Sequence, residues 1–323
     1  MRKFVIRRLL QLIPLLIGIS LISFFVIHLA PGDPTNLFVD PSVQPEELAR
    51  IRANFGLDKP VIVQYFYWLK NVLRGDFGTS YFTGKPVVLE IAERLPATLL
   101  LMVSSMLITL IITIPLGVYS AVKKGKFFDQ FFTVFSFAGM AIPSFWLGLM
   151  LMLLFAVQLH WFPAVGMFSY QLKDAVWYIK ALDVMHHMFL PLLTMTILSL
   201  AGMSRYQRAA MLEVLKEEYI KTARAKGLPE KVVIFKHALR NALIPTVTIL
   251  GLSLSGLFSG AFIIETIFAW PGMGRLGVQA IFSRNYPLIM GVVMLSAVLI
   301  ALGNLLADIG YALVDPRIRY GKK

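Results

Sequence analysis

The residues with the clearest potential for chemistry form a glycine-rich run near position 272. Gly272, Gly274 and Gly277 match the G-x-G-x-x-G spacing that lets a backbone approach a dinucleotide pyrophosphate. Such a site also needs a preceding strand and an acidic residue about 20 positions later, and no acid lies between Gly277 and Asp308. The run follows a long apolar block instead of a strand pattern. We therefore interpret it as a turn or a re-entrant element.

Other candidate sites fail on spacing. The stretch from Gly78 to Lys85 is the nearest approach to a phosphate-cradling Walker loop, but its gap is wrong and Pro86 follows Lys85. His186 and His187 are adjacent, which is not the spacing that chelates a metal from one helix face, and we interpret them as an interfacial pair. The chain has no cysteine, which excludes disulfides, thiolate zinc sites and cysteine nucleophiles. The sequence therefore predicts no catalytic site, no metal and no cofactor bound by this chain.

The composition is that of a membrane protein. Hydrophobic residues make up 57% of the 323 residues and charged residues 15%, with a mean hydropathy of +0.72. A soluble domain carries about 25% charged residues. The apolar residues gather in uncharged blocks of roughly 20 residues, which is enough helix to cross about 30 Å of hydrocarbon. The expected fold class is all-α, with bundled transmembrane helices.

Six such blocks predict six spans. The first has four basic residues in front of it, as a secretory signal would, but it is too long for one and has no A-x-A-like cleavage site, so we expect an uncleaved anchor. The blocks are Leu9 to Ala30, Pro96 to Val122, Phe131 to Val157, His187 to Met203, Asn241 to Ile264 and Pro287 to Ala307.

The basic residues predict the orientation of these spans. With both termini inside, the inner segments hold 20 of the 31 Lys and Arg and 7 of the 18 Asp and Glu, so the whole net charge of +13 lies on the inner side. Cytoplasmic segments of membrane proteins retain Lys and Arg. The charge therefore fits a multi-pass protein of a cytoplasmic membrane beside anionic lipid headgroups, and it does not indicate nucleic-acid binding.

The outer segment, residues 31–95, is too long to be a simple connector. Pro45, Glu46 and Glu47 resemble a helix start and Gly56 a helix stop. A second helical stretch, Val61 to Leu73, is rich in aromatic residues. Two interpretations are compatible: a small cap packed on the bundle, and a docking surface for an external partner.

The inner segment, residues 204–240, predicts a short cytoplasmic helix. The stretch Glu213 to Ala225 has high helix propensity, and Glu217 with Lys221 forms a favourable pair four residues apart. Gly227 is expected to end the helix in a left-handed conformation, with Pro229 shortly after it. The alternative, a solvated basic loop, explains the charge but not the helix pattern.

Two features within the spans allow either a translocation path or ordinary helix packing. Pro143, with Ser144, interrupts the hydrogen bonding of the third span, which a membrane tolerates where backbone faces protein or a water-filled cavity. The fifth span has a region of small residues that includes Ser253, Ser255 and Ser259. Such a region suits either a packing seam or a pore wall.

The inner segment carries the strongest resemblance to a known family. Glu218 to Leu228 (EYIKTARAKGL) and His237 to Pro245 (HALRNALIP) resemble the Glu-Ala-Ala loop of binding-protein-dependent ABC importer permeases, in the version of the dipeptide and oligopeptide permeases. Further matches run along nearly the whole chain in the family's order. They are APGDP at Ala30, LDKP at Leu57, GDFGTS at Gly75, IPSFW at Ile142, WPGMG at Trp270 and DPR at Asp315.

The resemblance implies a type I ABC importer permease fold and a role without catalysis. The domains would be residues 1–30 with the first helix, an extracytoplasmic segment 31–95, a five-helix core 96–310 containing the coupling loop 204–240, and a cytoplasmic tail 311–323. The implied partners are a second, homologous permease, two ATPase subunits that bind ATP and Mg²⁺, an external solute-binding protein, and lipid of a bacterial inner membrane. The coupling residues would be Glu218, Tyr219, Thr222, Ala223, Arg224, Ala225, Lys226 and Gly227.

One departure from the family pattern leaves alternatives open. Lys221, Thr222 and Ala223 occupy the Glu-Ala-Ala positions, so Glu218, one turn earlier, is an alternative source of the acid that contacts the ATPase. Peptides are the solute that the resemblance implies, and nickel permeases are close relatives of that branch. A proton-coupled transporter is disfavoured because charges within the spans are almost absent, with only Asp308 near the end of the sixth, and a membrane-embedded enzyme because no acids or histidines cluster at the membrane face.

Overall fold

The chain folds into two compact helical units. The computed structural model describes residues 2–29, 46, 50, 52–53, 56–172, 174–256 and 261–314. Unit 1 comprises Met1–Thr98, Phe258–Phe262 and Pro271–Lys323, and unit 2 comprises Leu99–Leu257 and Ile263–Trp270. Among the described residues, every regular element is a helix, and the single extended pairing is an isolated bridge between Thr79 and Pro86. The all-α prediction is confirmed for this part of the chain.

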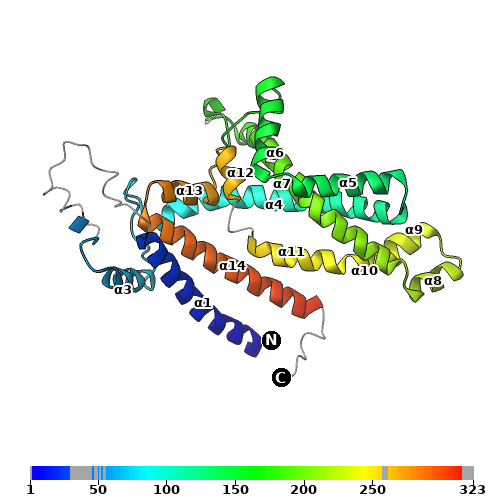
Figure 1. Cartoon of the computed structure of the whole chain (residues 1–323), viewed down its shortest axis with the longest axis horizontal. Helices are drawn as coiled ribbons and strands as arrows, with labels where there is room; N and C mark the ends of the chain where they lie inside the picture. The colour runs from blue at the N-terminus through cyan, green and yellow to red at the C-terminus, as the bar shows by residue number, and fades with distance from the viewer. Residues whose placement is uncertain are drawn as a thin grey trace. The chain divides into compact units, whose positions relative to one another are not determined.

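Unit 1 is built on two long apolar helices. Helices α1 (Arg2–Leu29) and α14 (Tyr286–Val314) lie side by side (Figure 1). The unit also contains α3 (Val61–Val72), the start of α4 (Val87–Val122) and α13 (Met273–Phe282). The first turn of α4 packs against α14 so closely that a Cβ on Gly291 would lie 2.2 Å from Val87 Cγ1. Glycine is therefore required at this contact.

The outer segment contributes an aromatic cluster to unit 1. Tyr65 on α3 is buried beside Phe24 of α1, with ring centroids 5.3 Å apart, and its hydroxyl lies 2.9 Å from Ser20 Oγ. Helix α3 matches the helix expected at Val61 to Leu73, and its one buried residue, Tyr65, packs against α1 as a cap would, while a docking role stays a prediction. The helix expected at Pro45 to Gly56 falls largely outside the described residues.

Unit 2 contains the other helices. They are the rest of α4, α5 (Phe127–Ala141), α6 (Ser144–Leu151), the π-helix η2 (Met152–Gln158), the 3-10 turn η3 (Tyr170–Leu172), α7 (Trp177–Val214), α8 (Glu218–Ala225), α9 (Glu230–Val232), the π-helix η4 (Val233–Ala238), α10 (Leu239–Ala242), α11 (Ile244–Gly256) and most of α12 (Phe262–Ile267). Helix α5 packs along α7 (Figure 1).

The membrane-spanning helices agree with the expected number. Leu10–Leu29, Val87–Val122, Trp177–Val214 and Tyr286–Leu305 are each long and apolar enough to cross a membrane. Two bent pairs, Phe127–Ala141 with Ser144–Gln158 at 104° and Glu230–Ala242 with Ile244–Leu250 at 41°, bring the number to six if each pair is one span. The number of spans is therefore consistent with the sequence, although two of them are broken.

Several expected limits are wrong. The fourth span begins at Trp177 instead of His187, and its helix continues to Val214, so residues 204–214 of the inner segment belong to α7. The glycine-rich run at Gly272 caps and begins a ten-residue helix, α13, so it is not a simple turn, and the alternative of a re-entrant element stays a prediction.

Candidate coupling site

Helix α8 is fixed to unit 2 by an apolar anchor. Ile220 is 0% exposed and Ala223 is 7% exposed. Both lie in a cluster with the ends of α4 and α7, with η4 and with α10, whose members are Val118, Ala121, Ala210, Met211, Val233, Ile234, Ala238 and Ala242. Burying one isoleucine side chain contributes about 1.5–3 kcal/mol. An eight-residue helix, marginal in isolation, is thus held by tertiary packing.

The end of α8 has the geometry of a Schellman motif. Gly227 has φ +74°, its N–H donates to the Arg224 carbonyl at 2.9 Å, and the Leu228 N–H donates to the Ala223 carbonyl at 3.4 Å. These are the two bonds that close a helix through a left-handed residue. The conformation expected for Gly227 is confirmed.

Polar contacts hold α8 on both sides. The Arg224 guanidinium donates two bonds to Glu230, at 2.7 and 3.2 Å, and this carboxylate raises the pKa of the guanidinium. Asn241 Nδ2 donates to the Tyr219 hydroxyl at 2.7 Å. The expected pairing of Lys221 with Glu217 is wrong: Glu217 caps the helix start in an extended conformation, and Lys221 bonds Glu218 at 2.7 Å.

The remaining surface of α8 faces outward. Glu218, Thr222 and Ala225 follow one another at helical spacing and are exposed, and Tyr219 beside them is 40% exposed. Of the two small residues expected to permit close approach by a partner, Ala225 is on this free surface. Ala223 is not, because it is buried in the cluster of its own chain. Arg224, Lys226 and Gly227 are also exposed.

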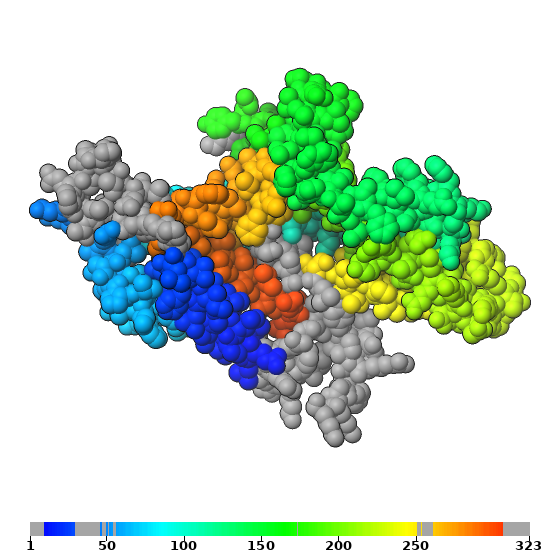
Figure 2. All heavy atoms as spheres, in the orientation of Figure 1, coloured from blue at the N-terminus to red at the C-terminus, as the bar shows by residue number. Residues whose placement is uncertain are grey.

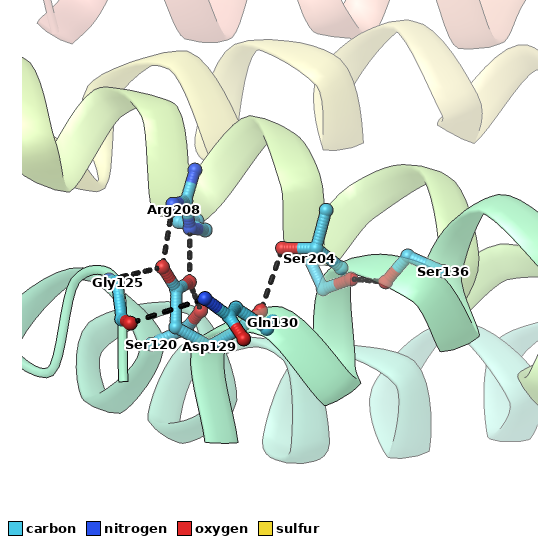
Figure 3. Close-up of polar contacts among 8 residues, drawn as sticks. Ser120, Gly125, Asp129, Gln130, Ser136, Ser204 and Arg208 are labelled. Atoms are coloured by element: carbon cyan, nitrogen blue, oxygen red, sulfur yellow. Dashed lines mark hydrogen bonds and ion pairs between the residues drawn. The ribbon is translucent and has the colours of Figure 1, made fainter. Parts of the chain in front are cut away.

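A buried ion pair joins the helices beneath α8. Asp129, at the start of α5, accepts bonds from Arg208 of α7, at 2.5 Å to Nε and 2.8 Å to Nη2 (Figure 3). The Ser120 hydroxyl of α4 and the Gly125 N–H, at 2.8 Å, donate to the same carboxylate. Asp129 is 3% exposed, so all of its acceptor capacity is used within the protein. The carboxylate therefore connects α4, α5 and α7 through charged hydrogen bonds.

A second contact extends this network to the fifth span. The Thr246 hydroxyl donates to Gln207 Oε1, and both side chains are buried. A Cβ on Gly117 would lie 2.6 Å from Gln207 Cγ, so α4 and α7 meet at a glycine. The sequence reasoning missed Asp129, Arg208, Gln207 and Thr246, because partners 39 and 79 positions apart leave no local pattern.

The residues proposed for a translocation path are dispersed. Helix α5 ends at Ala141, the next residue, Ile142, has a ψ of 125° that is extended as expected before proline, and Pro143 then caps α6. The expected interruption is confirmed, and it is a sharp break. Ser253 is exposed and donates to the Ile249 carbonyl at 2.8 Å. The Ser255 side chain and all of Ser259 lie outside the described residues. A role in a path stays a prediction for all five.

The two adjacent histidines serve local structure. His186 Nε2 lies 2.8 Å from the Trp161 carbonyl. His187 lies 3.4 Å from Asp183 Oδ1, and this carboxylate also accepts bonds from the N–H and hydroxyl of Ser169. Within the described part of the chain, no group of three or more His, Cys, Asp or Glu could hold a metal. The pair tethers the loop that precedes α7.

These features define a multi-span membrane protein with a capped helix seated on the joined ends of its spans. Residues 113–320 match the family model described as "Binding-protein-dependent transport system inner membrane component", and residues 1–102 match the model of the N-terminal region of such components. The chain belongs to this family, the permeases of ABC import systems. The resemblance seen in the sequence is confirmed.

Similar proteins cover the whole chain. The oligopeptide transport system permease protein AppB of Bacillus subtilis is 46% identical over 99% of this chain and 100% of its own length. The dipeptide transport system permease protein DppB of Escherichia coli K12 is 41% identical over 100% of both chains. The glutathione transport system permease protein GsiC of Salmonella typhimurium is 39% identical over 99% of this chain.

Proposed function

We propose that this chain is one of two permease subunits of an ATP-driven peptide importer and that α8 is the element by which it engages an ATPase subunit. The relatives named for oligopeptide, dipeptide and glutathione transport support peptides as the solute. The geometry of α8 supports the coupling role: Ile220 anchors one side of the helix, and Glu218, Thr222 and Ala225 are exposed on the other.

The proposed mechanism assigns each side of α8 a task. The free side fits into a groove of the ATPase, where Ala225 allows close approach and Glu218 offers an exposed carboxylate. The ATPase binds ATP with Mg²⁺ and supplies the free energy of hydrolysis, and this chain contributes no catalytic group. When the ATPase moves, the buried side transmits the displacement, because Ile220 is packed against the ends of α4, α7 and η4.

The network beneath α8 supports transmission to several spans. Asp129 joins α5 to α4 and α7, and Gln207 joins α7 to α11. A displacement of α7 would therefore be transmitted to α4, α5 and α11 through short, buried contacts. In the proposed complex a homologous permease supplies the other half of the path and an external solute-binding protein delivers the peptide. Both termini and α8 lie on the cytoplasmic side in this proposal.

Bulky substitution on the free side of α8 tests the proposal. Ala225→Trp should insert and accumulate normally, since position 225 is exposed, but should reduce recovery of the ATPase subunits. Ala181→Trp, an exposed alanine near the other end of α7, is the matched control. Co-purification from membranes and uptake of a labelled dipeptide are measured per amount of permease. Wild-type recovery and uptake in Ala225→Trp would refute docking through α8, whereas uptake of nickel but not of peptide would refute the solute.

A further inference from the structure

A groove of about 500 Å³ lies within unit 2, beside the α8 anchor. It runs between the end of α4, the start of α5 and the segment η4–α10. Its walls are apolar, with one tyrosine, and include Val118, Val122, Phe128, Ile234, Phe235 and Leu239. Val118 and Ile234 belong as well to the cluster that holds Ile220. The groove is therefore continuous with the packing under α8.

Exposed cations are sequence neighbours of the residues that line this apolar groove. Lys124 and Lys126 lie in the loop that joins two lining residues, Val122 and Phe128, and Lys236 directly follows the lining residue Phe235. All three are exposed, and none is ion-paired to a residue in the described part of the chain. The neighbouring acid, Asp129, does not neutralise them, because it is buried and bound to Arg208.

Two large aromatic side chains at or next to the lining residues of this groove are exposed. Phe127 is 83% exposed and Phe235 is 60% exposed. Figure 2 shows α5 and the segment around α9 and α10 at the surface of unit 2. Exposed aromatic rings beside lysines are typical of a membrane–water interface, where the rings meet the headgroups.

We propose that this groove binds an anionic phospholipid, with an acyl chain along the apolar walls and the headgroup phosphate at Lys124, Lys126 and Lys236. The complementarity selects this occupant. A soluble anion would leave the apolar walls in contact with water, and a zwitterionic lipid has no net negative charge to pair with three unpaired cations. Anionic lipids are concentrated in the cytoplasmic leaflet, where the proposed orientation places these lysines. The bound lipid would stabilise the apolar cluster that holds Ile220 of α8.

Fluorescence quenching in vesicles tests the site. The experiment uses the full-length chain with the subunits that accompany it. This chain contains no cysteine, so Phe235→Cys gives it a single site for a bimane label. The probes are brominated phosphatidylglycerol and brominated phosphatidylcholine in symmetric vesicles. We expect phosphatidylglycerol to quench at a lower mole fraction, by on the order of fivefold for each lysine engaged. The difference should shrink at high salt.

Neutralising variants identify the cations. Lys124→Gln, Lys126→Gln and Lys236→Gln together should abolish the preference, whereas Lys70→Gln, Arg74→Gln and Lys216→Gln, which remove the same charge at other exposed positions, should preserve it. Equal quenching by both lipids, or a preference unchanged in the first variant, would overturn the proposal. So would quenching by neither lipid, which would show protein in the groove. Symmetric vesicles make the result independent of orientation, solute and ATPase docking.

Discussion

Substitution of Gly227 by valine isolates the contribution of the α8 cap. Gly227 has φ +74°, and a Cβ there would meet nothing within 4 Å, so the substitution causes no clash. The cost is conformational: a left-handed L-residue costs about 1–2 kcal/mol, and β-branched residues are the least tolerant. The Schellman bonds from Gly227 and Leu228 would then compete with this strain.

That cost is large compared with what holds α8. Burial of Ile220 contributes about 1.5–3 kcal/mol, and the exposed pair of Arg224 with Glu230 adds about 0–1 kcal/mol. A loss of one to two kcal/mol shifts such an equilibrium by a factor of about 5–30. We therefore expect Gly227→Val to reduce ATPase recovery and peptide uptake by about 5- to 30-fold, with the amount of permease in the membrane unchanged.

The assay uses two control variants. Gly75→Val places the same strain, at φ +83° and in open space, in the outer segment, and it should leave ATPase recovery unchanged. Gly227→Asn should restore most of the recovery, because asparagine tolerates the left-handed region. Wild-type recovery and uptake in Gly227→Val would refute the reasoning and direct attention to the basic loop around Lys123.

Three further outcomes are expected. Asp129→Asn should lower the melting temperature in detergent, because breaking a buried ion pair costs about 3–5 kcal/mol, less here because Arg208 is partly exposed; an unchanged melting temperature would contradict the network. Ile220→Ala, which removes about 2–5 kcal/mol of core packing, should weaken ATPase recovery with little loss of permease, and full recovery would argue against the anchor. An impermeant thiol reagent applied to intact cells should label a single cysteine at position 70 and not one at position 224; the reverse pattern would invert the proposed topology.

The sequence predicts what depends on local pattern. Apolar blocks locate the spans, and a glycine followed by a proline predicts how α8 ends, because both signals are confined to a few residues. The pairing of Lys221 with Glu218 instead of Glu217 was not predictable in this way, since it depends on the residue at which α8 begins. Three residues after Val214 break the expected helix from Glu213 into the end of α7 and the start of α8.

The network beneath α8 depends on the tertiary fold. Asp129 is a single acid near three lysines in sequence, and a local reading assigns it to those lysines. Its partner in the structure is Arg208, which comes 79 residues later in the sequence, beyond α6, η2 and most of α7. Only the packing of α5 along α7 brings the two together. Sequence spacing therefore identifies the helix that we propose meets the ATPase, but not the buried contacts beneath it.

The wide turn of η4 has a consequence for the register of the fifth span. In an α-helix Val233 would stack over His237, four residues on, and a polar ring would face the apolar cluster. The π geometry of Val233–Ala238 places residues five apart on one side, so Ala238 is buried with Val233 and His237 is turned aside. Straightening this turn to α geometry with every residue retained would rotate everything before it by about 100° relative to α10. The wide turn therefore sets the direction of α8 relative to α10, and an insertion in this one turn should be far less tolerated than in the loops on either side.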